Sequence, residues 1–287
     1  MVLFVMILTA FFRPAAAQAA SAEKEVSFKT ADGWTISGML SAPKGVRKLP
    51  AVLFLHAFAH DREAYGQYLY PGLAQIIGAK DVATLRIDLR GRGRSRGAKE
   101  LHSFSAEELS KVYLDVRAAL KFLAEQETID PSRLAIVAEE ESADAAVLGG
   151  AIDPRVKAIT LVSGRLSDVA KKKIAVSRSA LLLILSKEDR EGFRDMAAAY
   201  NLSRNPRSRI WVFSDLGIAT TMFSVWRSEH PKDEPIEEGI SRWMLEQIGN
   251  GDRRDAASVQ SQKRGVRERQ MNGNSSASKS AAPKSDR

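Results

Sequence analysis

Three consecutive glutamates, Glu139 to Glu141, separate two segments of different character. The β-branched run Leu134–Ala138 precedes them, and the alanine-rich stretch Ala143–Ala151 follows. This pattern predicts a strand, a tight turn and a helix, with the side chain of Glu140 at the tip of the turn. A carboxylate there could attack an electrophilic carbon, and together the three could bind a cationic ligand or a divalent cation. Their mutual repulsion should raise at least one pKa. A solvated acidic turn is the simpler interpretation.

The composition limits what other chemistry the chain can perform. The chain has 287 residues, 44% of them hydrophobic, and no cysteine. This length allows one large α/β domain with appendages. The lack of cysteine excludes disulfides, a thiolate nucleophile and cysteine-based metal sites. Phosphate-binding glycine loops, the zinc-protease pattern and the calcium-loop pattern are absent from the sequence, so it predicts no cofactor and no metal site.

The two ends of the chain differ from its middle. Residues 1–22 contain the apolar run Val2–Phe12 followed by small residues, which predicts a signal peptide or an N-terminal anchor and therefore export. Residues 249–287 carry nine Lys or Arg against four Asp or Glu, a net charge of +5 within a total of +8. This tail has few large apolar residues, and we expect it to be disordered. The sequence therefore predicts a folded domain over residues 23–248.

Strand-like and helix-like segments alternate through that domain, which favours a mostly parallel sheet of about eight strands with helices on both faces. An Asp32-Gly33 turn predicts a hairpin, and Ala51–His56 reads as a buried central strand. Helices are expected over Glu63–Ile77 and over Ser105–Gln126, where Ser105 and Glu108 form a capping box. Only 17 residues, Ser163 to Ser179, separate two later strands, so no cap domain fits there. The remaining expected elements are the strands 82–89, 134–138, 158–162, 180–185 and 209–213 and a final helix over 236–248.

Four segments carry a resemblance to a known family. They are Pro50–Phe58, which ends in a His-Ala turn, the Asp-x-Arg-Gly-x-Gly-x-Ser loop Asp88–Ser95, the strand approach Asp130–Val137, and the strand entry Asp153–Ala158. With this order of elements, the chain resembles the alpha/beta-hydrolase superfamily from about Glu25 to Ile248. It is most similar to the small lidless members, such as dienelactone-hydrolase-like and serine-aminopeptidase-like proteins.

The resemblance implies a serine, an acid and a histidine at fixed places, and two of the three are replaced. Glu140 stands where the family has its nucleophilic serine, and Ile218 stands where it has its histidine. Asp189 matches the acid position best, followed by Glu188. A solvated turn acid is an equally simple interpretation of Asp189.

Other residues could take over parts of such a site. The backbone N–H groups of Phe58 and Glu141 match the oxyanion positions. Ser142 is an alternative nucleophile, although it should point away from the tip. His230 is a weak alternative base, which fits a surface histidine better, and His60 is another candidate.

Three hypotheses follow. The first is an exported pseudoenzyme of hydrolase fold that binds or scaffolds an unknown small molecule or protein. The second is a working hydrolase of a small ester, lactone or amide that uses Glu140 or Ser142. The third is a binder of nucleic acid or of an anionic surface through the arginines of segment 86–96, Lys171–Lys173 and the tail. The predicted export argues against nucleic acid, and a weak contact of the tail with an anionic surface is what remains of the third hypothesis.

Overall fold

Continuous apolar runs form the middle of an eight-stranded sheet, because a strand covered on both faces has no polar side. The computed structural model describes residues 21–46, 48–65 and 72–249. The strands are β1 (Ser21–Lys29), β2 (Thr35–Pro43), β3 (Leu49–Leu55), β4 (Ala83–Ile87), β5 (Ile129–Glu139), β6 (Val156–Val162), β7 (Ala180–Ser186) and β8 (Arg209–Phe213). Every residue of β3, β4 and β7 is buried.

The strand order places the candidate site residues at one edge of the sheet. The order is β1-β2-β4-β3-β5-β6-β7-β8. Strands β3 to β8 run parallel to one another, whereas β2 is antiparallel to both β1 and β4. The carboxyl ends of the six parallel strands therefore meet at one edge, which is where ligands bind in sheets of this kind.

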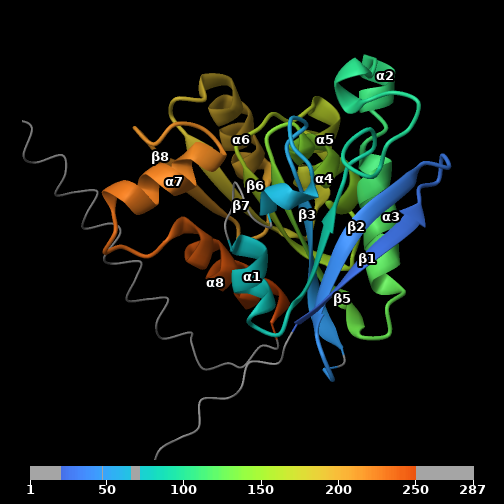
Figure 1. Ribbon diagram of the computed structural model, residues 1–287. Coiled ribbons are helices and arrows are strands. Elements are labelled where there is room, and N and C mark those ends of the chain that lie inside the picture. The colour runs from blue at the N-terminus through green and yellow to red at the C-terminus, as the bar shows by residue number, and fades with distance from the viewer. Residues whose placement is uncertain (1–20, 47, 66–71, 250–287) are drawn as a thin grey trace, which may run out of the picture. The chain divides into compact units, whose positions relative to one another are not determined.

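Helices cover both faces of the sheet (Figure 1). They are α1 (Leu73–Gly78), α2 (Ala106–Leu109), α3 (Tyr113–Ala124), α4 (Ser142–Gly150), α5 (Asp168–Val176), α6 (Arg190–Leu202), α7 (Thr220–Glu229) and α8 (Ile236–Ile248). Two short 3-10 turns, η1 (Arg62–Tyr65) and η2 (Leu101–Ser103), complete the set. Helices α3 to α6 lie on one face, and α1, α7 and α8 lie on the other. Each face buries its own hydrophobic cluster.

Several expectations from the sequence are confirmed. Residues around Asp32-Gly33 join β1 to β2 in an antiparallel hairpin. Strand β8 and helix α8 have the bounds that the sequence predicts. Ser105 and Glu108 form the capping box with reciprocal hydrogen bonds of 3.3 and 2.8 Å. A single helix, α5, connects β6 to β7, so no cap is inserted between them.

Two expected helices are wrong in extent. The helix expected over 63–77 is interrupted, because Gly72 has φ +97°, a left-handed conformation that cannot lie inside an α-helix. The helix expected over 105–126 is divided into α2 and α3 by a tight turn at Ser110–Val112. There the N–H groups of Lys111 and Val112 bond to carbonyls three residues back, and Ser110 Oγ donates to Glu107 O at 2.6 Å.

Helices α5, α6 and α7 were not predicted from the sequence. Ser167 caps α5 by accepting from Ala170 N at 3.2 Å, and Asp189 caps α6. Residues 1–20 and 250–287, which hold most of the expected signal segment and tail, lie outside the described residues. Export and tail disorder therefore stay predictions. Within the described ranges, we find no helix with the length and apolar character that crossing a bilayer requires.

The Asp-x-Arg-Gly-x-Gly-x-Ser loop holds neighbouring segments together by buried hydrogen bonds and an ion pair. The buried Asp88 carboxylate accepts from the backbone N–H groups of Arg62 and Arg94, both at 2.9 Å. Ser95 Oγ donates to Asp88 O at 2.6 Å and accepts from Ser37 N at 2.8 Å. Buried Arg90 pairs with the buried Asp115 at 2.8 Å. The loop thereby fixes β2 and β4 to the segment that follows β3.

The arginines in and beside this loop mostly have partners inside the molecule. Arg86 pairs with Glu23 at 3.0 Å, Arg94 pairs with Glu25, and Arg92 donates to the carbonyl oxygens of Ala59 and His60. Their positive charge therefore contributes to holding the fold together.

Candidate active site

The residue at the tip of the turn has the backbone conformation that the sequence pattern predicts. We call residues 138–142 the elbow. Glu140 has φ +46°, which is rare for a residue with a side chain. Its N–H donates to Val162 O and its carbonyl accepts from Ala143 N, both at 3.1 Å. A β-carbon on Gly164 would stand 2.3 Å from Glu140 O, so only glycine lets the loop after β6 pack this closely. The strained tip is retained, with a carboxylate on it.

Ser142 holds the elbow together and is not placed to attack a substrate. Its side chain is fully buried at the start of α4. Its Oγ accepts a hydrogen bond from Glu139 N at 3.1 Å. The same hydroxyl donates toward two carbonyl oxygens, Glu139 O at 2.8 Å and Leu55 O at 3.1 Å. The structure therefore contradicts Ser142 as a substitute nucleophile, since its hydroxyl faces β3 and β5.

The carboxylates beside the tip occupy backbone donors of the loop after β3. Glu139 is fully buried, and its Oε1 accepts from Ala57 N at 2.9 Å. Glu141 Oε2 accepts from Phe58 N at 3.2 Å. Phe58 N–H is one of the two donors expected to stabilise an oxyanion. The donor that the sequence predicts for an oxyanion is therefore already bonded to the protein's own carboxylate.

Two histidines on the same loop have different roles. His56 is buried, with Nδ1 2.7 Å from Ala57 O and Nε2 accepting from Leu89 N at 3.1 Å, and burial lowers its pKa. It is a neutral structural ring. His60 Nδ1 lies 3.6 Å from Glu139 Oε1, which is an ion-pair distance and too long for a hydrogen bond. Glu139 raises the pKa of His60 above its ordinary value, and partial burial opposes that effect.

Glu140 is half-buried among like charges. Burial is the main cause that raises its pKa, followed by the charges of Glu141 and Glu139 and, more weakly, of Asp189. The charge on His60 opposes the shift. The elbow, His60 and Asp189 are therefore close enough to interact electrostatically. The sequence predicted such a raised pKa within the three glutamates.

Replacing Glu139 by glutamine should lower the pKa of His60. In the wild type the imidazolium is favoured, so this pair stabilises the fold below the unfolded-state pKa of about 6.5. That stabilisation is lost as the pH rises through the higher folded-state value. Following the His60 ring protons by NMR between pH 5 and 9 measures the shift. A His60 pKa that is the same in wild type and Glu139→Gln would show that the pair does not interact, and His102 serves as an exposed internal reference.

The acid position is occupied by two residues with different partners. Asp189 Oδ1 accepts from Gly192 N at 3.0 Å and so caps α6. Glu188 Oε1 accepts from Asp215 N at 2.9 Å, and its other oxygen accepts from Ser186 Oγ. Glu188 ties the end of β7 to the loop after β8, whereas Asp189 also interacts with Glu140.

The residue predicted at the family's histidine position, Ile218, lies in the loop after β8. Ile218 is 45% exposed there. The next residue, Ala219, has φ +50° and donates its N–H to Ser163 Oγ at 3.1 Å, which joins this loop to the one after β6. An aliphatic side chain at position 218 cannot accept a proton.

His230 lies at the end of α7, twelve residues further along the chain. Its ring stacks on Trp226 with centroids 4.2 Å apart, and its Nδ1 is 3.4 Å from Asp233 Oδ2. These contacts hold His230 on its own helix and turn. His60 is the histidine that the structure places beside the elbow.

The three glutamates do not converge on one point. Glu139 bonds to Ala57, Glu141 bonds to Phe58, and Glu140 occupies the tip between them. In the described part of the chain, no three carboxylate or imidazole groups are arranged to hold a metal ion. The alternative of a divalent cation at the elbow therefore has no geometric support.

The role of Glu139 was not predicted from the sequence. The simpler interpretation of the three glutamates was a solvated acidic turn, whereas Glu139 is a buried acceptor. A signal for this was present, since Glu139 directly continues the apolar run of β5, and a carboxylate at the end of a buried strand needs internal donors.

Solved structures share this architecture. A dienelactone hydrolase from Anabaena variabilis superposes with a TM-score of 0.63 and 17% identity over 79% of this chain and 99% of its own. An acetyl xylan esterase from Paenibacillus gives 0.62 and 17% over 82% and 87%. An alpha/beta hydrolase from Penicillium gives 0.62 and 12% over 80% and 100%. The chain has the alpha/beta-hydrolase fold. At these identities, the likeness concerns the fold alone.

Curated relatives match only part of this alpha/beta-hydrolase-fold chain. A thiohydrolase from Arthrinium phaeospermum is 30% identical over 139 residues, which are 48% of this chain and 42% of that protein. A polyketide transferase from Stachybotrys chlorohalonatus is 28% identical over 136 residues, 47% of this chain and 42% of that protein. The chain thus spans less than half the length of either. No protein-family model matches it.

Proposed function

We propose that this alpha/beta-hydrolase-fold protein is a pseudoenzyme that binds or scaffolds a partner and does not hydrolyse substrates. One observation carries the proposal: the Glu141 carboxylate accepts a hydrogen bond from Phe58 N–H. A serine hydrolase keeps such donors available for the developing oxyanion. Here the donor already serves an anion, and a second anion at that place would be repelled by the first.

The residues around this contact support the same conclusion. Glu139 occupies the neighbouring donor, Ala57 N–H, from a fully buried position. Ile218 offers no proton acceptor at the position of the base. Asp189, which would orient a histidine, caps a helix. Asp189 has no histidine to orient, and the Phe58 donor is already bonded to Glu141. The site therefore lacks a complete set of groups for acyl transfer.

The wild-type chain should not hydrolyse esters or thioesters faster than buffer does. We would measure release from short-chain p-nitrophenyl esters and from acyl thioesters, the latter because two relatives are named a thiohydrolase and a polyketide transferase. Glu140→Ala is the matched control, since it removes the tip carboxylate and keeps Glu139 and Glu141. Turnover that disappears in Glu140→Ala would overturn the pseudoenzyme and make Glu140 a carboxylate nucleophile.

That outcome defines the second candidate function, an active hydrolase of small esters, lactones or amides. It is favoured by His60, whose Nδ1 lies 3.6 Å from Glu139 Oε1 and whose charge lowers the pKa of Glu140. The Glu140 carboxylate would attack the ester carbonyl carbon and displace the alcohol, which takes up a proton, leaving a mixed anhydride on Glu140. His60 would then take a proton from the water that hydrolyses this anhydride, releasing the acid product and restoring the Glu140 carboxylate. In that case His60→Gln should abolish turnover together with Glu140→Ala.

A further inference from the structure

A large apolar side chain is exposed in, or directly before, each of three successive loops at the amino edge of the sheet. They are the loops that lead from α4 to β6, from α5 to β7 and from α6 to β8. Ile152 is 53% exposed, Val176 is 70% exposed and Leu202 is 40% exposed. They are three of the six exposed large hydrophobic residues in the described part of the chain. We call this set of loops the basal face.

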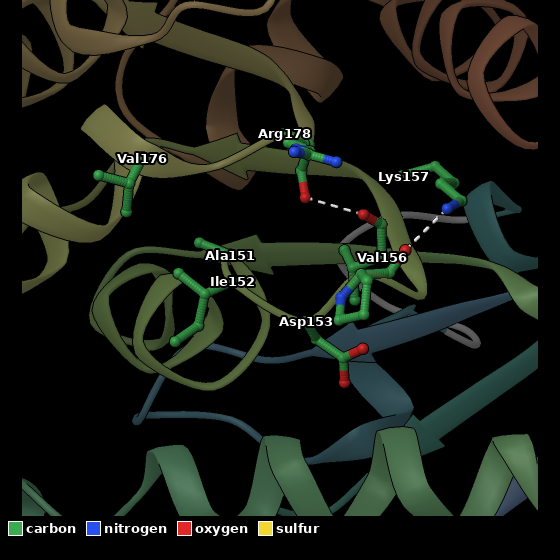
Figure 2. A pocket seen from close by; sticks show the side chains of 9 residues that line it. Ala151, Ile152, Asp153, Val156, Lys157, Val176 and Arg178 are labelled. Carbon is green, nitrogen blue, oxygen red and sulfur yellow. Dashed lines mark hydrogen bonds between the residues drawn. The ribbon is translucent and has the colours of Figure 1, made fainter.

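A hollow of about 540 Å³ lies between the first two loops. Figure 2 shows Ile152 and Val176 on the left of the view, with Arg178 and Lys157 to their right. Lys157 is on β6, and Arg178 lies in the loop before β7. A second hollow of about 430 Å³ shares Val176 and Arg178 and extends to Arg204. Asn205 Nδ2 donates to Arg178 O at 2.7 Å and fixes these two loops to each other. The hollows therefore form one grooved surface along β6, β7 and β8.

Exposed cations lie on the same three segments as the apolar side chains. They are Lys157, Arg178, Arg204 and Arg207. The only acid on residues 151–157, 176–179 and 203–209 is Asp153, which Arg155 already engages at 2.6 Å. Within the described ranges, neither Arg178 nor Arg204 has a carboxylate partner. The basal face thus differs from the loop 88–95, where arginines are paired internally.

Both ends of the described body lie at this same edge. Ser21 pairs with Pro43 at the end of β2. Because β2 runs antiparallel to β4, the end of β2 lies beside the amino end of β4. At the other end, Arg133 in the first half of β5 donates to Ile248 O at 3.3 Å. The apolar run Val2–Phe12 precedes the first junction in sequence, and the segment of charge +5 follows the second.

We propose that the basal face docks on an anionic lipid bilayer. Guanidinium groups bind phosphates in two-point contacts, and short apolar side chains among them can enter the headgroup region. A single acidic residue, already paired, leaves little to repel anionic lipids. A bilayer also accounts for the apolar run and the basic segment, because both join the body at the edge that faces it. The candidate active site then faces away from the lipid, at the opposite edge of the sheet.

Vesicle binding of the full chain tests this proposal. The probe is sedimentation with vesicles made of equal parts of phosphatidylcholine and phosphatidylglycerol, against pure phosphatidylcholine, at physiological ionic strength. Arg178→Gln/Arg204→Gln should weaken partitioning to the anionic vesicles about 30-fold, since each basic residue near the surface contributes about 1 kcal/mol. Ile152→Ser/Val176→Ser should also weaken it, and should do so equally at high salt.

Matched variants separate this face from charge in general. Arg96→Gln/Lys187→Gln removes two exposed cations at the carboxyl edge and should change partitioning less than about threefold. Val169→Ser is the apolar control on α5. Circular dichroism confirms that each variant is folded. Equal losses in the two charge variants, equal binding to both vesicle types, or no binding by the wild type would each overturn the proposal. If the partner were an acidic protein rather than lipid, the wild type would not bind to vesicles.

Discussion

Gly93→Ala should lower the free energy of unfolding by about 3 kcal/mol. Gly93 has φ +45°, and a β-carbon built there would stand 2.3 Å from the carboxyl group of Asp88. That carboxylate is buried and accepts from two backbone N–H groups, so it cannot move without leaving them unbonded. The cost combines left-handed backbone strain, a steric clash and lost hydrogen bonds. Urea unfolding followed by tryptophan fluorescence measures it.

Gly33→Ala is the matched control, because it keeps the strain and omits the clash. Gly33 has φ +87° and nothing within 4 Å of its built β-carbon. We expect it to lose about 1 kcal/mol. If the two variants were equally stable, the close approach of the hydrogen-bonded Asp88 carboxylate would not be the reason for glycine at position 93.

Removing the Glu141 carboxylate should produce the largest functional effect. The background is Glu140→Ser/Ile218→His, which restores a nucleophile and a base to the positions that the resemblance assigns. In that background, adding Glu141→Ala should raise kcat for p-nitrophenyl acetate about 100-fold, because one oxyanion-hole donor contributes roughly 10²–10³ in rate. The released donor is Phe58 N–H. Steady-state rates corrected for buffer hydrolysis measure the ratio.

Glu141→Gln in the same background is the control that separates the hydrogen bond from the charge. The glutamine amide oxygen can still accept from Phe58 N–H, so this variant should gain far less than Glu141→Ala. Equal gains would mean that charge repulsion, rather than an occupied donor, limits the site. No gain in either would show that Phe58 N–H is not an oxyanion donor.

Much of the fold could be predicted because its signals are local. The buried runs of β3 and β7, the Asp32-Gly33 hairpin and the capping box at Ser105 each need only a few adjacent residues. The interruptions at Gly72 and Ser110 were missed, since apolar spacing alone does not show where a backbone turns. Helices α5 to α7 were missed although Ser167 and Asp189 were available as caps.

The site was less predictable, because its contacts join distant segments. The elbow shape followed from residues 134–151, and its tip at Glu140 is where the pattern expects it. The bonds of Glu139 and Glu141 to Ala57 and Phe58 span more than 80 positions in the sequence. Only the parallel pairing of β3 with β5 brings these residues together. Which histidine approaches the elbow was likewise decided by the loop after β3.

The hydrogen bonds of Glu139 and Glu141 also alter the balance between stability and activity. A hydrolase holds its anion donors without a protein partner until substrate arrives, and each buried unbonded donor costs about 1–3 kcal/mol of stability. Here Glu141 gives the partly exposed Phe58 donor a partner within the fold, so the smaller cost of leaving such a donor unbonded is absent. Engineered catalysis would bring it back, and the most active variants should also be the easiest to unfold. Heat resistance and turnover would then move in opposite directions across such a series.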